Sequence, residues 1–203
     1  KYILQYTTKN YTMKEITYQF GTPVKEGSLW KIPINAKSNE PLQIFGINFR
    51  FLYDTRLFKE SKLGGFKLVL PDGYRNYNSF LNDSPSGWSM FGSTGPISYI
   101  NTQIEMTDHN KAISVDGEFK TIFHITLVPK AGITGQQFPS FIFDKRIDPV
   151  KGDAGMIGQS AGITTTAYLE DDDTGEFLTG PVRSIAIQYN WENTPNVTKY
   201  PWG

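Results

Sequence analysis

Cysteine is absent from the 203 residues of the sequence, which excludes disulfide bonds and thiolate metal sites. No apolar run approaches the length that a helix needs to cross a bilayer. Excess charge of one sign is also missing, because 20 lysines and arginines balance 20 aspartates and glutamates. This balance gives no electrostatic footprint for nucleic acid or an anionic membrane. The sequence therefore predicts neither a membrane-spanning helix nor a nucleic-acid-binding protein.

A sustained helical period is missing as well. Aromatic residues make up 14% of the chain and glycine occurs 19 times, beside frequent threonine, asparagine and serine. This mixture is typical of exported β-proteins. The chain starts at Lys1 without a charged and then apolar leader, which favours a processed protein. We expect an extracellular or cell-surface location in a bacterium.

The clearest structural signal is the stretch Ile44–Leu57. Its large side chains alternate with smaller or polar ones, which is the period of a half-buried β-strand. The bulky row that we expect to face a core consists of Phe45, Ile47, Phe49, Phe51 and Tyr53. The following Asp54 and Thr55 are typical of a turn.

Further strands are predicted by the same alternation, separated by turn residues. Their expected inward rows begin with Ile16, Tyr18 and Phe20, continue with Trp30, Ile32, Ile34 and Ala36, and end with Ile185, Ile187 and Tyr189. Pro33 cannot donate to a ladder, so its strand should lie at a sheet edge or carry a bulge. The segment Tyr74–Gly95 is predicted as an ordered loop insertion rich in aromatic residues.

Three segments carry a resemblance to a known family. They are GTPVKEGSLWKIPINAKSNEPLQIFGINFRFLYDTRLF, GEFKTIFHITLVPKAGITG and GPVRSIAIQYN. The first resembles the opening strands of cohesin modules, the second their later phenylalanine-rich strand, and the third their closing strand. The resemblance implies a jelly-roll β-sandwich on a bacterial extracellular protein that binds a dockerin partner through one sheet face.

The predicted fold is therefore all-β, a jelly-roll or β-sandwich of about nine or ten strands. We divide the chain into an N-terminal extension or extra strand over residues 1–15, a cohesin-like domain over 16–190, and an extended tail over 191–203. The candidate partner surface consists of side chains expected to point outward from the two clearest predicted strands, Ile44–Leu57 and residues 119–127. It comprises Asn48, Arg50, Leu52, Lys120, Ile122 and His124. Which sheet is exposed to the partner stays open at this point.

Aromatic residues in loop-like sequence give an alternative function, the binding of a polysaccharide. Exposed rings stack on sugar faces or anchor an interface. The candidates are Tyr74, Tyr77, Trp88 and Phe91. Packing of these rings beneath a long loop is the competing interpretation.

Self-association is a further possibility. Tyr2, Leu4 and Tyr6 share one parity ahead of the domain, so this segment can be read as a strand donated to a neighbouring copy. Such a donation would make the protein a filament or surface-layer subunit. The partner is accordingly expected to be a protein, either dockerin-like or a second copy.

The acidic cluster Asp171, Asp172, Asp173 and Glu176 makes calcium a possible ligand, although it lacks the EF-hand register. No cofactor is required by any motif. The Gly158–Gly162 segment matches G-x-S-x-G, but both histidines precede Ser160, whereas that motif needs a later one. Asp173-Thr174-Gly175 occurs once and is flanked by charges, unlike a paired aspartic-protease site. The sequence therefore predicts a non-catalytic module.

Overall fold

The computed structural model describes residues 14–55, 57–84, 97–132, 141–143, 163–170 and 177–187. These residues form twelve strands and two short 3₁₀ helices, η1 and η2. The strands are β1 (Glu15–Phe20), β2 (Val24–Glu26), β3 (Leu29–Ser38), β4 (Leu42–Asp54), β5 (Phe66–Val69), β6 (Tyr74–Ser84), β7 (Ile97–Met106), β8 (Ile113–Val115), β9 (Lys120–Leu127), β10 (Phe141–Phe143), β11 (Ile163–Glu170) and β12 (Phe177–Ile187). The 3₁₀ helices are η1 (Ser61–Leu63) and η2 (His109–Lys111). The predicted all-β jelly-roll sandwich is confirmed, with more strands than expected.

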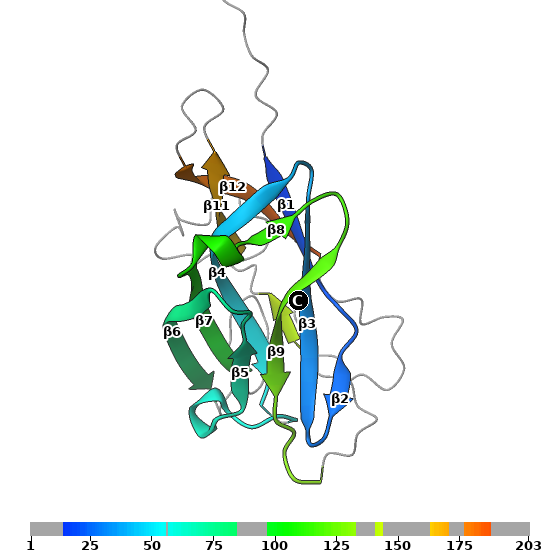
Figure 1. Cartoon of the computed structure of the whole chain (residues 1–203). Coiled ribbons are helices and arrows are strands. Elements are labelled where there is room, and N and C mark those ends of the chain that lie inside the picture. Colours follow the sequence, from blue (N-terminus) through cyan, green and yellow to red (C-terminus); the bar gives the residue numbers. More distant parts are fainter. Residues whose placement is uncertain are drawn as a thin grey trace, which may run out of the picture.

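The strands form two layers that share one strand (Figure 1). One layer, called here the β3 sheet, has the order β5-β9-β3-β1, with β2 paired to β3. The other, called the β4 sheet, has the order β11-β4-β7-β6, with β8 and β10 paired to β4. Strand β12 joins them, because its first half pairs with β11 and its second half runs parallel to β1.

Strand β4 is the centre of its sheet, as the sequence predicts. It pairs with β7 and β8 along one side and with β11 and β10 along the other. Ile47, Phe49 and Tyr53 are buried, but so is Ile44, which has the opposite parity. The reason is a register irregularity opposite Thr166 and Ala167, where β4 contains one extra residue, Phe45. The prediction that Phe45 belongs to the buried row is therefore wrong, and this ring is half-buried.

The core lies between the inner faces of the two sheets. Phe49 of β4 stacks against Phe123 of β9, with ring centroids 5.7 Å apart. The predicted inward rows of β1 and β3 are confirmed, because all seven of their side chains are buried. Alternation of apolar and polar residues thus directs these strands toward one core.

Pro33 does not mark a sheet edge, since β3 lies between β9 and β1. Its carbonyl accepts a hydrogen bond from the Gly21 amide at 2.8 Å, in the gap between the end of β1 and the start of β2. A missing N–H is tolerated there because no strand residue faces Pro33 from that side. The β3–β9 register shifts between Ile34 and Asn35, but the extra residue there, Ile122, belongs to β9, so the predicted bulge in β3 at Pro33 is not found either.

The predicted loop beginning at Tyr74 is partly a strand. Residues 74–84 form β6, which pairs with β7, while residues 85–96 lie outside the described residues. Tyr74 is 8% exposed, and its hydroxyl donates to the Ile44 carbonyl and accepts from the Ile113 amide. This tyrosine therefore ties β6 to β4 and β8.

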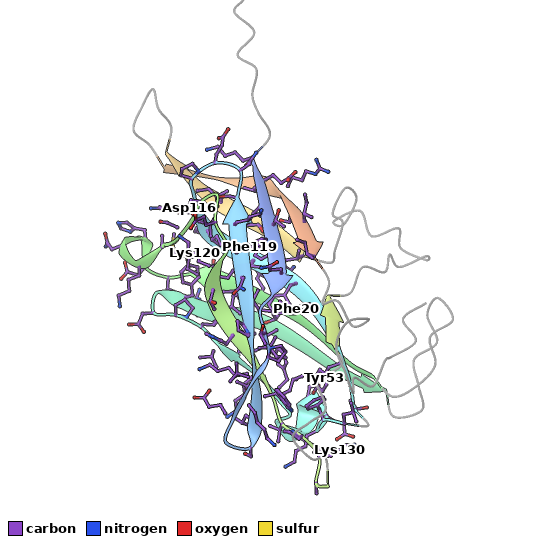
Figure 2. The ribbon with its side chains drawn as sticks, turned by 90° about the vertical axis from the view of Figure 1, so that its right-hand side faces the viewer. Phe20, Tyr53, Asp116, Phe119, Lys120 and Lys130 are labelled. Carbon is purple, nitrogen blue, oxygen red and sulfur yellow. The ribbon has the colours of Figure 1, made fainter. Side chains whose placement is uncertain are left out.

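Hydrogen bonds and an ion pair connect the segment after β4 to the segment that follows β9. The Tyr53 hydroxyl donates to the Lys59 carbonyl at 2.8 Å, and the Lys130 amide donates to the Leu57 carbonyl at 2.9 Å. Lys130 also forms an ion pair with Glu60 at 2.9 Å. Figure 2 shows Tyr53 and Lys130 toward the same end of the sandwich. Several independent bonds therefore hold this connection.

A cluster of hydroxyl groups is buried where β12 passes from one sheet to the other. The Tyr18 and Thr165 hydroxyls lie 2.7 Å apart, and the Ser184 hydroxyl donates to Thr165 at 2.8 Å. All three residues are buried. Burial raises the pKa of Tyr18 well above its ordinary 10.0, and burial also raises that of Tyr74. Both phenols therefore stay protonated in the folded protein at neutral pH.

We expect the free energy of unfolding to fall as the pH rises above 10, because tyrosines in the unfolded chain lose protons there while Tyr18 and Tyr74 keep theirs. Each raised pKa contributes stability that is complete below the unfolded value and is lost as the pH approaches the folded one. The slope from Tyr18 approaches about 1.4 kcal/mol per pH unit once the unfolded tyrosine is deprotonated, and Tyr74 acts in the same direction. Urea denaturation at several alkaline pH values measures it. Tyr18→Phe should give a shallower slope, and an unchanged slope in this variant would contradict the linkage.

The predicted division into an extension over residues 1–15, a domain over 16–190 and a tail over 191–203 stays a prediction. Strand β1 begins at Glu15 and β12 ends at Ile187, whereas residues 1–13 and 188–203 lie outside the described residues. Within the part of the chain that the structure describes, no helix has the length and hydropathy needed to cross a membrane.

Candidate functional site

The six predicted partner residues belong to strands of two different sheets. Asn48, Arg50 and Leu52 belong to β4, and the other three belong to β9. Because Phe49 and Phe123 meet in the core, the outward parities of these strands point to opposite sides of the sandwich. The structure therefore does not bring the two halves of the predicted surface together.

On β9, the predicted outward row is interrupted by a bulge. Ile122 is 4% exposed, since the β3 partners pass from Phe123 directly to Thr121 and leave Ile122 as the extra residue. Its prediction as a surface residue is wrong for this reason. Lys120 is exposed and lies 3.9 Å from Asp116, and the two labelled residues stand together in Figure 2.

His124 lies on the outer face of the β3 sheet and is half-buried. Burial lowers its pKa below the ordinary 6.5, the charge of Lys31 lowers it further, and Glu26 opposes both. The imidazole is accordingly neutral at pH 7. It adds no charge to this face.

On β4, Asn48 is exposed as predicted. The side chains of Arg50 and Leu52 lie outside the described residues, although their backbone belongs to the strand. Beside Asn48 the outer face contains a hollow of about 260 Å³. It is lined by Phe45, Gly46, Ile47, Asn48, Gln103, Ile104, Glu105 and Thr166.

Gly46 explains why the hollow exists. It pairs with Glu105 of β7 on one side and with Thr166 of β11 on the other, so it occupies the middle of three neighbouring strands. Its missing side chain leaves the space open. A Cβ at this position would lie 3.3 Å from the Ile104 carbonyl oxygen, so the backbones also approach closely here.

The chemistry around the hollow is polar. Glu105 Oε2 lies 3.0 Å from Arg75 Nη2, a cross-strand ion pair between β7 and β6. Asn48, Gln103 and Thr166 add amide and hydroxyl groups. The sequence reasoning missed Gln103, Glu105 and Thr166. The signal was present for β7, because Gln103 and Glu105 alternate with the buried Thr102, Ile104 and Met106.

Of the four alternative sugar-binding side chains, the structure describes only that of Tyr74. Tyr74 is buried and hydrogen-bonded, so its prediction as an exposed stacking ring is wrong. The Tyr77 side chain, Trp88 and Phe91 lie outside the described residues. The strand-donation residues Tyr2, Leu4 and Tyr6 lie outside them too.

The acidic residues Asp171, Asp172, Asp173 and Glu176 also fall outside the described ranges. Among residues 14–55, 57–84, 97–132, 141–143, 163–170 and 177–187, no group of three or more histidine or acidic side chains is placed to hold a metal ion. Ser160 lies outside these ranges as well.

Comparisons with known proteins find similarity only at the level of structure. No family model matches the sequence, and no curated protein matches it. The seventh ScaB type I cohesin from Pseudobacteroides cellulosolvens is similar at a TM-score of 0.43 and 12% identity, over 85% of this chain and 88% of the cohesin. The OlpA cohesin in a type I cohesin–dockerin complex from Clostridium thermocellum has a TM-score of 0.43 and 14% identity, over 86% and 95%.

A cohesin module of a family 33 glycoside hydrolase from Clostridium perfringens is also similar, at a TM-score of 0.34 and 11% identity, over 87% of this chain and 99% of the module. All three are cohesin modules, the family that the sequence motifs resemble. Because every TM-score lies below 0.5, the likeness by itself assigns no partner to this chain.

Proposed function

We propose that this chain is a non-catalytic module that binds a protein partner through the outer face of the β4 sheet. The observation that carries the proposal is the polar hollow at Gly46, which opens onto exposed Asn48 at the centre of three paired strands. Flat sheet faces with a recess suit a folded partner, because complementary side chains enter the recess while the rim stays polar.

Two features support a protein partner rather than a sugar. Tyr74 is packed in the interior, which removes one of the proposed stacking rings. The exposed surface of the hollow is mainly polar, whereas sugar sites rely on exposed aromatic faces. A dockerin-like module on the surface of a bacterial cell is the partner that the sequence resemblance suggests.

The non-catalytic part of the proposal is supported by where the hydroxyl groups lie. Thr165 and Ser184 are buried with Tyr18, so no substrate reaches them. Tyr18 cannot act as a general base at neutral pH, since burial raises the pKa of its phenol and keeps it protonated. Hydroxyls in this cluster therefore serve the fold.

Replacing Asn48 by arginine should weaken partner binding by at least about tenfold, because the added bulk stands at the rim of the hollow. The first probe is a dockerin module, the kind of partner named for the cohesin complex above. Calorimetry measures its dissociation constant against the native chain and the variant.

Thr121→Arg is the matched control, because Thr121 is exposed on β9 in the opposite sheet and receives the same added side chain. Both variants should keep the thermal unfolding temperature of the native chain within a few degrees. Loss of binding in Thr121→Arg with full binding in Asn48→Arg would place the partner on the other face and contradict the proposal.

Self-association by the segment around Tyr2, Leu4 and Tyr6, and calcium binding by Asp171, Asp172, Asp173 and Glu176, stay predictions from the sequence. Light scattering after size exclusion, with and without calcium, distinguishes ordered oligomers from a monomer. If the chain is a monomer in both conditions, the result favours a function as receptor for a separate partner protein.

A further inference from the structure

The bulge in β4 shapes the hollow that the proposed function uses. The extra residue Phe45 lies directly before Gly46, and both line the hollow. A bulge re-aims the side chain of the inserted residue. Phe45 therefore stands beside Gly46, which has no side chain. Gly46 in turn lies between Thr166 of β11 and Glu105 of β7.

Three hydrogen-bond acceptors face this space. The side chain of Glu105 is 28% exposed, and Arg75 occupies its Oε2. From the described residues, its Oε1, the Asn48 amide and the Thr166 hydroxyl receive no further side-chain hydrogen bond or ion pair. A carboxylate oxygen accepts only, and an amide and a hydroxyl each also offer lone pairs.

The kind of side chain that fits follows from these groups. An aliphatic group would cover the acceptors without bonding them, which costs free energy. A carboxylate would meet the negative charge of Glu105. A lysine or arginine instead supplies several N–H donors and a positive charge, and charge-assisted hydrogen bonds are the stronger ones.

Arg75 does not fill this role itself. It reaches Glu105 from β6, pairs through Oε2, and has a side chain that is 58% exposed. This ion pair uses Oε2 and leaves the other carboxylate oxygen, Oε1, to accept from an incoming donor.

We propose that the hollow at Gly46 binds a lysine or arginine side chain of the partner protein, with the Glu105 carboxylate as its principal acceptor. This inference rests on the proposed function, because it identifies the partner chemistry of the same sheet face. It adds that the partner presents a cationic residue at the centre of its docking surface.

The test uses N-acetyl-arginine amide as the probe and the N-acetyl amide of citrulline, its uncharged isostere, as the comparison. In a ¹⁵N NMR titration of the full chain, the backbone amides of Gly46, Asn48 and Glu105 should shift saturably with the arginine probe. The citrulline probe should bind about tenfold more weakly, since it lacks the charge. Equal binding of both probes, or no saturable shift at these amides, would overturn the inference.

Glu105→Gln should weaken the arginine probe by about tenfold while the rest of the spectrum stays unchanged. Glu118→Gln is the control, because Glu118 is exposed in the turn before β9 and does not line the hollow. The same affinity in Glu105→Gln and the native chain would reject the carboxylate as acceptor. This experiment contains no partner protein, so it tests the cation site separately from the proposed function. If the arginine probe does not bind but Asn48→Arg still weakens partner binding, the cation site is rejected and the proposed binding face is retained.

Discussion

Replacing Gly65 by alanine is expected to lower the free energy of unfolding by at least about 3 kcal/mol. A Cβ on this residue would lie 1.9 Å from the Lys59 carbonyl oxygen and 2.8 Å from that of Glu60. Both are backbone atoms of a segment that cannot easily move away. Its bonds to Tyr53 and Lys130 described above would have to break first, together with the hydrogen bond that the Lys59 amide donates to the Val128 carbonyl at 2.8 Å. Urea denaturation followed by circular dichroism measures the loss.

Two other glycines serve as controls for Gly65→Ala. Gly117 has nothing within 4 Å of an added Cβ and no positive φ, so Gly117→Ala should change stability by less than about 0.5 kcal/mol. Gly64 has equal space but a φ of +75°, so Gly64→Ala should cost about 1 kcal/mol from backbone strain alone. A Gly65→Ala variant no weaker than Gly64→Ala would contradict the close approach of the Lys59 carbonyl.

Replacing Phe49 by alanine is expected to cost about 3–5 kcal/mol. This ring is fully buried at the middle of β4 and stacks on Phe123 of the opposite sheet. Its removal leaves a cavity between the two layers that strands on both sides are too well paired to close. Thermal or urea unfolding measures the loss, and a drop in the midpoint at constant m-value indicates a change of stability alone.

Asn48→Ala is the control for this second variant, because Asn48 is the neighbouring residue of the same strand and points outward. It should change stability by no more than about 0.5 kcal/mol. Similar losses in the two variants would contradict the alternation on which the assignment of inner and outer faces rests.

Alternation predicted the positions and inner faces of several strands correctly. Ile16 and Tyr18 of β1, Ile32 of β3 and Phe49 of β4 all lie in the core, because a side-chain period of two fixes the buried face of any regular strand. Turn chemistry was informative as well. Pro71-Asp72-Gly73 has residue types that suit a β-turn, and the chain turns there with Gly73 at a φ of +83°.

Bulges explain two of the errors, those at Phe45 and Ile122. One extra residue reverses the parity of everything after it, and neither Phe45 nor Ile122 differs in type from an ordinary inward residue. The predicted inward row of the last strand, which included Ile187, was wrong for another reason. The core contains Val182 and Ser184, whereas Ile187 is 48% exposed, because the hydroxyl of Ser184 finds partners in the interior that the sequence does not reveal.

The candidate site was predictable in part. Outward parity identified Asn48, but the register of three strands decides that Glu105 and Thr166 stand beside Gly46. Those strands are far apart in sequence, so their pairing cannot be derived from local alternation. The same lack of long-range information left open which of the two strands, β4 or β9, faces the partner, and the fold places their outward faces on opposite sides.

The parallel pairing of β1 with β12 gives the domain a direction in which it resists mechanical load. Glu15 pairs with Arg183 and Gln19 pairs with Ile187, so the start of β1 and the end of β12 lie at opposite ends of the paired segment. Tension applied to the chain before β1 and after β12 pulls the two strands past each other in shear. All of their hydrogen bonds then carry the force together, instead of opening one after another as they would in an antiparallel hairpin pulled apart at its open end. Rupture under force is governed by the rate of unfolding, so this arrangement favours slow release of a domain held at both ends.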